Sequence, residues 1–362
     1  MVEADEVAAP VTDASPPLTV VGSPGLPGWL GERSISLLLT TYQAGRVFLI
    51  GGNPGNRLSV FQRAFSRCMG LSADPDGSGF WLATQFQIWR FADGLPHGGS
   101  HNNYDRVYVP RYAHTTGSVD THDLSGPALF AGQDHSVVFI STAFNCLATL
   151  SEKHSFRVLW KPPFISAITP EDRCHLNGLA TESGRPRYVT AVSTDDVADG
   201  WRAHRMGGGV VLDLDSNQIV ARGLSMPHSP RLHGGTLWAL DAGTGYFGRV
   251  DTERGEFEPM TFLAGFARGM ALVDDHAIVA VSKARESGTF GDLGLADELA
   301  RRGLEPQCGL RIIELSTGKV VQWLSIEGVV SELYDVAVLN HTHRPMALGL
   351  QTDEIQRLVS FE

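Results

Sequence analysis

Short apolar runs alternate with polar or glycine-containing turns through most of the chain. The clearest runs lie at residues 35–42, 46–50, 58–61, 79–84, 87–91 and 137–141. Apolar alternation over a few residues between turn signals is typical of β-strands. Three further segments, 210–220, 248–257 and 310–321, each contain a strand pattern, a polar turn and a second strand pattern. They predict hairpins, and the whole pattern indicates an all-β fold.

Similar short sequences recur at a fixed interval. Met69, His122, His175 and His228 are 53 residues apart, and Tyr334 follows after twice that interval, 106 residues. A period of roughly 40–50 residues is typical of repeat folds such as the β-propeller, whose blades have four strands each. Aligning the strand patterns gives six innermost strands, expected to begin near Met69, His122, Asn177, His228, Arg268 and Tyr334. We therefore expect six blades, with seven as the alternative because the terminal strand patterns do not fix how the ring closes.

The domain organisation follows from breaks in this period. Residues 28–362 are expected to form a single propeller domain, and the acidic, proline-containing segment 1–27 a disordered arm. The fifth innermost strand comes 13 residues early, and the excess lies at residues 287–307, which contain a helical pattern. This segment is expected to be a rim insertion with one short helix that could cover a site.

Composition narrows the function classes. The net charge of −11 argues against a general nucleic-acid binder. The N-terminal segment lacks a basic and apolar secretory signal, and no apolar run approaches the ~20 residues of a membrane helix. The four cysteines show no metal-type spacing and are expected to be reduced thiols. We expect a cytoplasmic protein without nucleic-acid or membrane partners; a protein partner is not indicated either way.

Three of the evenly spaced positions are histidines. In a propeller the innermost strands line a central channel, so His122, His175 and His228 should meet near its axis. Converging neutral imidazoles are a common way to hold Zn²⁺, Fe²⁺, Cu²⁺ or Mn²⁺ with an open position for water or substrate. The alternative is a metal-free polar channel in which these side chains contact only backbone groups and water.

Other polar residues stand at the same end of the innermost strands. Arg268, Asn177 and Arg67 are candidate substrate-binding residues, because an arginine there can hold a carboxylate or phosphate. Glu332, Tyr334 and Asp335 are candidate catalytic residues for proton transfer. The alternative for Arg268 is an ion pair with Glu332 or Asp335 across the channel.

Several short sequence segments resemble those of a known family. Those beginning at Thr40, Gly223, Gly265, Cys308 and Glu332 resemble a bacterial family of conserved hypothetical β-propeller proteins. More distantly, the chain is similar to the gluconolactonase, regucalcin and strictosidine-synthase propellers. The sequence Asn177-Gly-Leu-Ala resembles the motif that supplies a metal-ligand asparagine in that group. This chain departs from that group by offering histidines in place of its carboxylates.

Together these features predict an enzyme with a site in the central channel. It would act on a small, anionic organic substrate, with a divalent metal as Lewis acid or water activator. The predicted site is compatible with hydrolase, lyase or isomerase chemistry. The alternative is a non-catalytic propeller that serves as a ligand-binding or protein-interaction scaffold.

Overall fold

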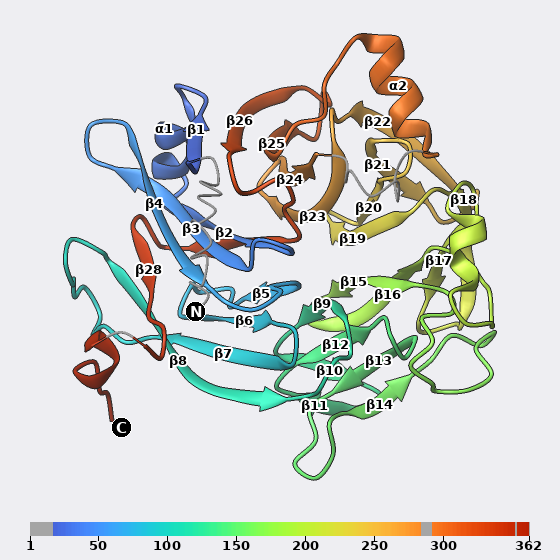
Figure 1. Cartoon of the computed structure of the whole chain (residues 1–362), viewed down its shortest axis with the longest axis horizontal. Coiled ribbons are helices and arrows are strands. Elements are labelled where there is room, and N and C mark those ends of the chain that lie inside the picture. The colour runs from blue at the N-terminus through green and yellow to red at the C-terminus, as the bar shows by residue number, and fades with distance from the viewer. Residues whose placement is uncertain (1–16, 284–291, 352, 362) are drawn as a thin grey trace, which may run out of the picture.

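The computed structural model describes residues 17–283, 292–351 and 353–361. Within these residues the strands form six main sheets arranged around a central axis (Figure 1). Each sheet is one blade, in which four successive strands pair in antiparallel fashion from the axis outward. The all-β propeller prediction is confirmed with six blades, and the seven-blade alternative is wrong.

Each blade has an innermost, a second, a third and a fourth strand, and the ring order begins with the N-terminal blade. In ring order, the innermost strands are β27 (Val336–Asn340), β5 (Leu71–Ala73), β9 (Thr121–Ser125), β15 (Leu176–Glu182), β19 (Pro227–His233) and β23 (Phe266–Val273). The second strands are β2 (Ile35–Thr41), β6 (Gly79–Ala83), β12 (Val138–Ser141), β16 (Arg185–Ala191), β20 (Thr236–Asp241) and β24 (His276–Ser282). The third strands are β3 (Arg46–Asn53), β7 (Gln87–Asp93), β13 (Cys146–Thr149), β17 (Gly209–Asp213), β21 (Tyr246–Asp251) and β25 (Gly309–Glu314). The fourth strands are β4 (Arg57–Ala64), β8 (Arg106–Thr115), β14 (Arg157–Trp160), β18 (Gln218–Leu224), β22 (Glu256–Phe262) and β26 (Val320–Glu327). Every innermost strand begins within two residues of its predicted position.

The ring closes by joining the two ends of the chain. The C-terminal strand β27 pairs with β2, with Val338 opposite Leu37, so the first blade contains strands from both ends. Two additional strands account for the surplus of terminal strand patterns. The first, β1 (Thr19–Gly22), adds an antiparallel edge to β26, and the second, β28 (Pro345–Ala347), adds a parallel edge to β8.

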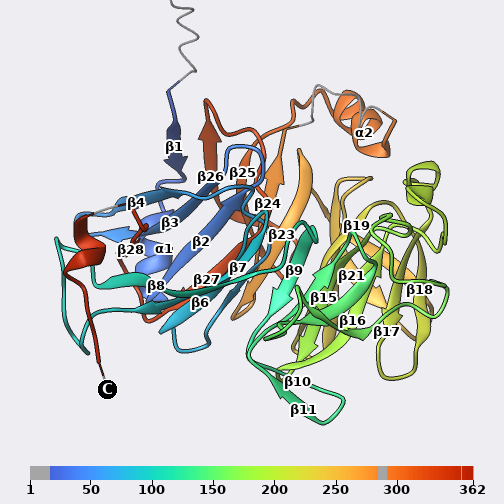
Figure 2. The ribbon, with the colours of Figure 1, turned by 60° about the horizontal axis from the view of Figure 1, so that its bottom comes forward.

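The segments outside the blades differ in part from expectation. Residues 1–16 lie outside the described residues, but β1 falls within the predicted disordered arm and is held by its pairing with β26. The helix α1 (Leu26–Glu32) follows it and buries Leu26 and Leu30. In the predicted insertion, residues 287–291 are not described, and α2 (Gly294–Arg302) forms a short helix. Figure 2 shows α2 on one face of the ring, and the β10–β11 hairpin (Ala128–Phe130 and Gln133–His135) projecting from the other.

The hydrophobic core lies between neighbouring blades. Leu38 and Leu49 of the first blade, for example, pack in one cluster with Phe80 and Phe91 of the second. The two phenylalanine rings stack with centroids 4.6 Å apart. The cysteines are buried and free, as expected of reduced thiols. No helix among the described residues is long and apolar enough to cross a membrane.

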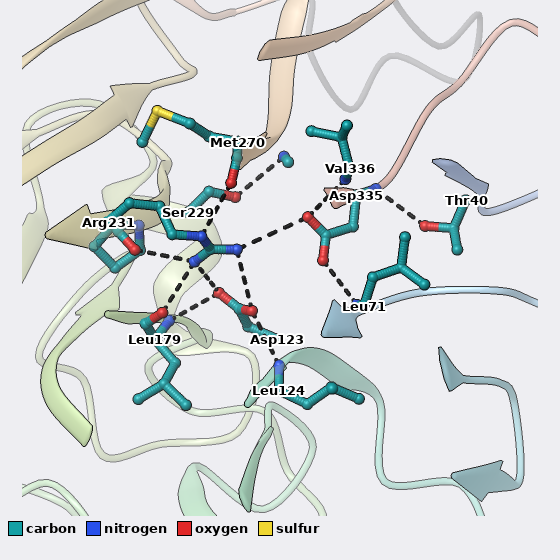
Figure 3. A network of polar contacts seen from close by, with 12 residues as sticks. Thr40, Leu71, Asp123, Leu124, Leu179, Ser229, Arg231, Met270, Asp335 and Val336 are labelled. Carbon is teal, nitrogen blue, oxygen red and sulfur yellow. Dashed lines mark hydrogen bonds and ion pairs between the residues drawn. The ribbon is translucent and has the colours of Figure 1, made fainter. Parts of the chain in front are cut away.

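At the axis, Arg231 of β19 is the centre of a polar network (Figure 3). Its Nη1 donates to Asp123 Oδ2 of β9 at 2.7 Å and to the carbonyl oxygen of Leu179 of β15 at 2.9 Å. Its Nε donates to the carbonyl oxygen of Met270 of β23 at 3.0 Å. One guanidinium group therefore links the innermost strands of four blades.

Asp335 extends this network to the remaining two blades. It directly precedes β27 and lies 3.8 Å from Arg231 Nη2. Its Oδ2 accepts the backbone N–H of Leu71 of β5 at 2.8 Å, and its Oδ1 accepts that of Val336 of β27 at 2.8 Å. Nearby, Gly269 has a φ of 74°, and a Cβ atom there would lie 2.5 Å from the Cα of Asp335, so only glycine fits. The network fixes the ends of all six innermost strands, on which the candidate site is built.

Candidate functional site

The structure brings the three predicted histidines together. His122 and His228 lie on β9 and β19, and His175 directly precedes β15. Ring nitrogens, one from each residue, lie within 4.8 Å of one another. The rings of His122 and His175 meet edge to face, with centroids 4.9 Å apart. Each histidine is at most 9% exposed, so the repeat spacing has placed them at equivalent points of three consecutive blades.

The Nδ1 atom of His122 is held by two acceptors. It lies 3.2 Å from the carbonyl oxygen of Asp120 and 2.7 Å from the hydroxyl oxygen of Thr142. The Thr142 hydroxyl donates its own proton to the carbonyl oxygen of Leu176 at 2.6 Å. It must therefore accept from His122, which places the ring proton on Nδ1 and leaves a lone pair on Nε2.

His228 is oriented in a similar way. Its Nδ1 lies 2.8 Å from the carbonyl oxygen of Met226, an obligate acceptor, so Nδ1 again carries the proton. Met226 has a φ of 50° and Asp120 a φ of 52°, in the left-handed region that non-glycine residues seldom adopt. Each stands two residues before its histidine, and in both cases the carbonyl oxygen faces that imidazole.

His175 depends on residues that the sequence analysis did not identify. Its Nδ1 lies 2.9 Å from Asp172 Oδ2, and Trp201 Nε1 donates to the same oxygen at 3.0 Å. The Trp201 ring also stacks on His175 with centroids 4.2 Å apart. Trp201 belongs to a 3₁₀ turn, Gly200–His204, outside the blade repeat. The carboxylate three residues before His175 was the one signal in the sequence that could have indicated this arrangement.

The rings are suited to coordinating a metal. Burial lowers the pKa of His122 to about 4, although Asp120 opposes the shift. Burial and the nearby Arg268 lower the pKa of His228 well below its usual value. These two rings are neutral at pH 7, and all three histidines retain Nε2 as the available ligand atom. Holding the opposite ring nitrogen by a carbonyl or carboxylate is the usual support of metal-binding histidines.

A cavity of about 170 Å³ opens beside these rings. Its lining includes His122, His175, Trp201, Arg268 and Tyr334. The helix α2 supports this wall from outside, since its Leu295 and Leu299 pack in one apolar cluster with Trp201. The cavity therefore lies on the face of the ring that carries α2.

Tyr334 lines the cavity opposite the histidines. Its ring stacks on Tyr42 with centroids 5.6 Å apart and meets His122 edge to face at 5.4 Å. Burial raises the pKa of its hydroxyl well above the usual value, so the group keeps its proton at neutral pH. Of the three predicted catalytic residues, Tyr334 alone is among the residues that line this cavity.

The two predicted catalytic carboxylates are engaged in other contacts. Glu332 Oε1 accepts from Arg268 Nη1 at 2.7 Å, and both side chains are buried. This is the ion pair that the sequence offered as an alternative for Arg268, and Arg268 lines the cavity as well. Asp335 faces the Arg231 network, where burial and repulsion from Asp123 raise its pKa. Its two oxygen atoms accept backbone N–H groups, so its position indicates a structural role.

The remaining predicted residues lie at different depths. Arg67 lies 3.8 Å from Asp120, with its guanidinium over the Tyr42 ring, and borders the cavity only through these residues. Asn177 lies deeper, where its Oδ1 accepts from the Thr190 hydroxyl at 2.7 Å. The predicted residues thus gather around the channel, but the sequence did not separate those at the mouth from those beneath the histidines.

The formal charges of the cavity lining balance. Asp120 and Asp172 oppose Arg202 and Arg268, and the buried Glu332 adds one negative charge behind Arg268. A divalent cation on the histidines would change the balance from −1 to +1 when Glu332 is included. The site would then attract a small anion rather than a neutral molecule or cation.

Comparison with a solved structure supports the fold. A chain of a nidogen/laminin complex matches 85% of this chain and 99% of its own length, with 11% identity and a TM-score of 0.51. A Bacteroides caccae protein of unknown function matches with 11% identity, 84% and 98% coverage, and a TM-score of 0.47. No curated protein matches significantly.

Sequence comparison assigns the family. The match runs from residue 24 to residue 348 and so includes the six blades and every residue of the candidate site. The chain belongs to the family described as a domain of unknown function, DUF4915.

Proposed function

We propose that this protein is a metal-dependent enzyme that acts on a small, anionic organic molecule at the mouth of the propeller channel. The observation that carries this proposal is the geometry of His122, His175 and His228. Their ring nitrogens lie within 4.8 Å of one another, and each Nδ1 is engaged by a separate acceptor. In an open site with three histidines, the ligand atoms lie roughly 3.3 Å apart for metal–nitrogen bonds of about 2.0–2.1 Å. Small movements of the rings suffice to reach that geometry.

The donor set limits the choice of metal. Three imidazoles suit Zn²⁺, Fe²⁺, Cu²⁺ and Mn²⁺ better than Ca²⁺ or Mg²⁺, which prefer oxygen ligands. Three protein ligands leave at least one coordination position open, as catalytic sites require. The metal would polarise a substrate oxygen or activate water. Arg268 would orient the anionic group, and Tyr334 would donate a hydrogen bond or a proton.

The size of the cavity limits the substrate. A volume of about 170 Å³ is close to the ~150 Å³ of a protein cavity that holds benzene. This suits a metabolite of a few carbon atoms and excludes a polymer segment from the site itself. The charge balance of the metal-loaded site favours a monoanion.

Metal analysis tests this proposal. Full-length protein purified without a histidine tag should contain close to one transition-metal ion per chain, removable by a chelator. His122→Ala, His175→Ala and His228→Ala should each lose most of the bound metal. The control is His154→Ala, because His154 is exposed. If the wild-type protein neither contains nor binds these metals, the enzyme proposal fails and the scaffold alternative replaces it.

A further inference from the structure

A smaller chamber of about 10 Å³ adjoins the cavity on its inner side. It shares His122, Arg268 and Tyr334 with the cavity, and it is lined more deeply by Asp123 and Asp335. Along the axis, the order is therefore cavity, histidines, inner chamber and Arg231 network. A volume of about 10 Å³, measured for water-sized probes, accommodates about one oxygen-sized atom.

Four buried polar atoms belong to residues that line this chamber and have no hydrogen-bonding partner in the described part of the chain. They are Asn177 Nδ2, His228 Nε2, Arg268 Nε and Tyr334 Oη. Their residues are between 2% and 7% exposed. A buried polar atom left unpaired costs about 1–3 kcal/mol, so four around one chamber indicate a common ligand.

The chemistry of these atoms defines the ligand. His228 Nε2 is an acceptor that a metal ion would satisfy. The other three are the donors of an amide, a guanidinium and a phenol. Hydrogen bonds from such donors are strongest when the acceptor carries a negative charge, so this group of donors favours an anionic oxygen over neutral water.

The blade order places two of these donors, Arg268 and Tyr334, on the blades that follow the three histidines, whereas Asn177 lies on β15 beside His175. His122, His175 and His228 come from three consecutive blades, and Arg268 lies on the innermost strand of the next blade, β23. Tyr334 stands just before β27, in the blade after that. A metal held by the histidines would thus turn its open side toward Arg268 and Tyr334.

Each donor is fixed by a separate contact. Glu332 holds Arg268 by its Nη1 and leaves Nε directed elsewhere. Tyr42 stacks on the Tyr334 ring, and Thr190 donates to the amide oxygen of Asn177. Donors fixed before binding lose little entropy when a ligand arrives, which is how oxyanion-binding groups in enzymes act.

We propose that Asn177, Arg268 and Tyr334 form an oxyanion pocket that receives one oxygen of a small carboxylate at the open side of the metal. The inference rests on the proposed function. The carboxylate is preferred over phosphate because Glu332 offsets Arg268, so the loaded site carries one net positive charge and matches a monoanion. The chamber admits a single oxygen, and the rest of the molecule occupies the outer cavity.

The test uses the full-length protein loaded with Co²⁺, whose visible absorption reports on its ligands, and acetate as the probe. Acetate should change the spectrum saturably and bind more tightly than inorganic phosphate. Tyr334→Phe removes only the hydroxyl and should weaken acetate binding about tenfold or more, while Co²⁺ stoichiometry stays at wild-type level. Asn177→Ala should act in the same direction and provides a second variant if Tyr334→Phe does not fold.

Tyr246→Phe is the matched control, because Tyr246 lies on β21 and its hydroxyl contacts Arg302 away from the cavity. Wild-type acetate affinity in both Tyr334→Phe and Asn177→Ala, with Co²⁺ bound, would overturn the oxyanion pocket and leave the metal proposal standing. Tighter binding of phosphate than acetate would overturn the assignment to carboxylates. Failure of the wild-type protein to bind Co²⁺ would overturn both proposals.

Discussion

Arg231 and Asp123 are 108 residues apart in the chain and are joined at the axis by hydrogen bonds of 2.7 Å and 3.3 Å. Asp123 lines the inner chamber, and together with Asp335 the pair links the innermost strands of all six blades. The histidines and the donors of the oxyanion pocket stand on or beside these strands. The network therefore positions the strands that carry the candidate site.

Arg231→Met is expected to destabilise the protein strongly. It leaves the Asp123 carboxylate, which is 4% exposed, without its counter-ion. Removing one partner of a buried ion pair typically costs about 3–5 kcal/mol. Urea denaturation should show this loss as a lower midpoint.

Arg185→Met is the control for that experiment. Arg185 pairs with Asp215 at 3.1 Å, but both side chains are about half exposed. Such surface pairs contribute roughly 0–1 kcal/mol. Equal midpoints for the Arg231 and Arg185 variants would contradict the role of the axial network.

Asp172→Ala is expected to lower metal affinity without removing a metal ligand. The carboxylate fixes the His175 tautomer through Nδ1, and loss of such support typically costs 10–100-fold in affinity. Asp172→Asn keeps an acceptor oxygen and should cost less than Asp172→Ala. Competition with a chromophoric chelator measures both values.

Asp199→Ala is the matched control for that series, since the exposed Asp199 directly precedes the 3₁₀ turn and, among the described residues, forms an ion pair with Arg202 of that turn. It should retain wild-type metal affinity. If Asp172→Ala also retains wild-type affinity, the Nδ1 support of His175 has no bearing on metal binding.

Asp241 should make stability depend on pH. Burial raises its pKa from 3.8 to about 6 in the folded protein, although the hydrogen bonds that Ser225 and Thr244 donate to it favour a lower pKa. The folded state therefore holds a proton that the unfolded state has released between pH 4 and 6. The contribution of Asp241 to the free energy of unfolding is fully present below pH 4. It falls by at most roughly 3 kcal/mol as the pH rises through 6.

Asp241→Asn isolates this effect because an amide can accept from the Ser225 N–H and donate to the Thr244 hydroxyl. The variant should be more stable than wild type at pH 7.5, with a difference that shrinks toward pH 4. Denaturation curves across this pH range provide the measurement. A difference that is constant with pH, or that grows as pH falls, would contradict the assignment.

The sequence predicted the parts of the site that follow the repeat. The spacing of 53 residues sufficed to place His122, His175 and His228 at equivalent points, because equal intervals return to the same level of successive blades. Arg268 and Tyr334 were located by the same alignment, even though the fifth blade is short. The innermost strands could be positioned to within two residues for the same reason.

The remaining features depend on contacts that have no period. Asp172, Trp201 and Thr142 lie outside the repeat alignment, and their support of the histidines appears only when the loops are folded. Asp335 illustrates a different limit, since a polar residue at the end of an innermost strand can serve chemistry or hold strands together. Its two backbone N–H partners, from Leu71 and Val336, favour the structural role.

The most direct test of the central claim is the metal content of tag-free wild-type protein beside that of His122→Ala, His175→Ala and His228→Ala. We expect close to one transition-metal ion per wild-type chain and a large loss in each variant, with circular dichroism unchanged. The same metal content in all four proteins would place the metal elsewhere. No metal in the wild-type protein, together with an unchanged melting temperature after addition of Zn²⁺, Fe²⁺, Cu²⁺ or Mn²⁺, would show that the three histidines do not form a metal site.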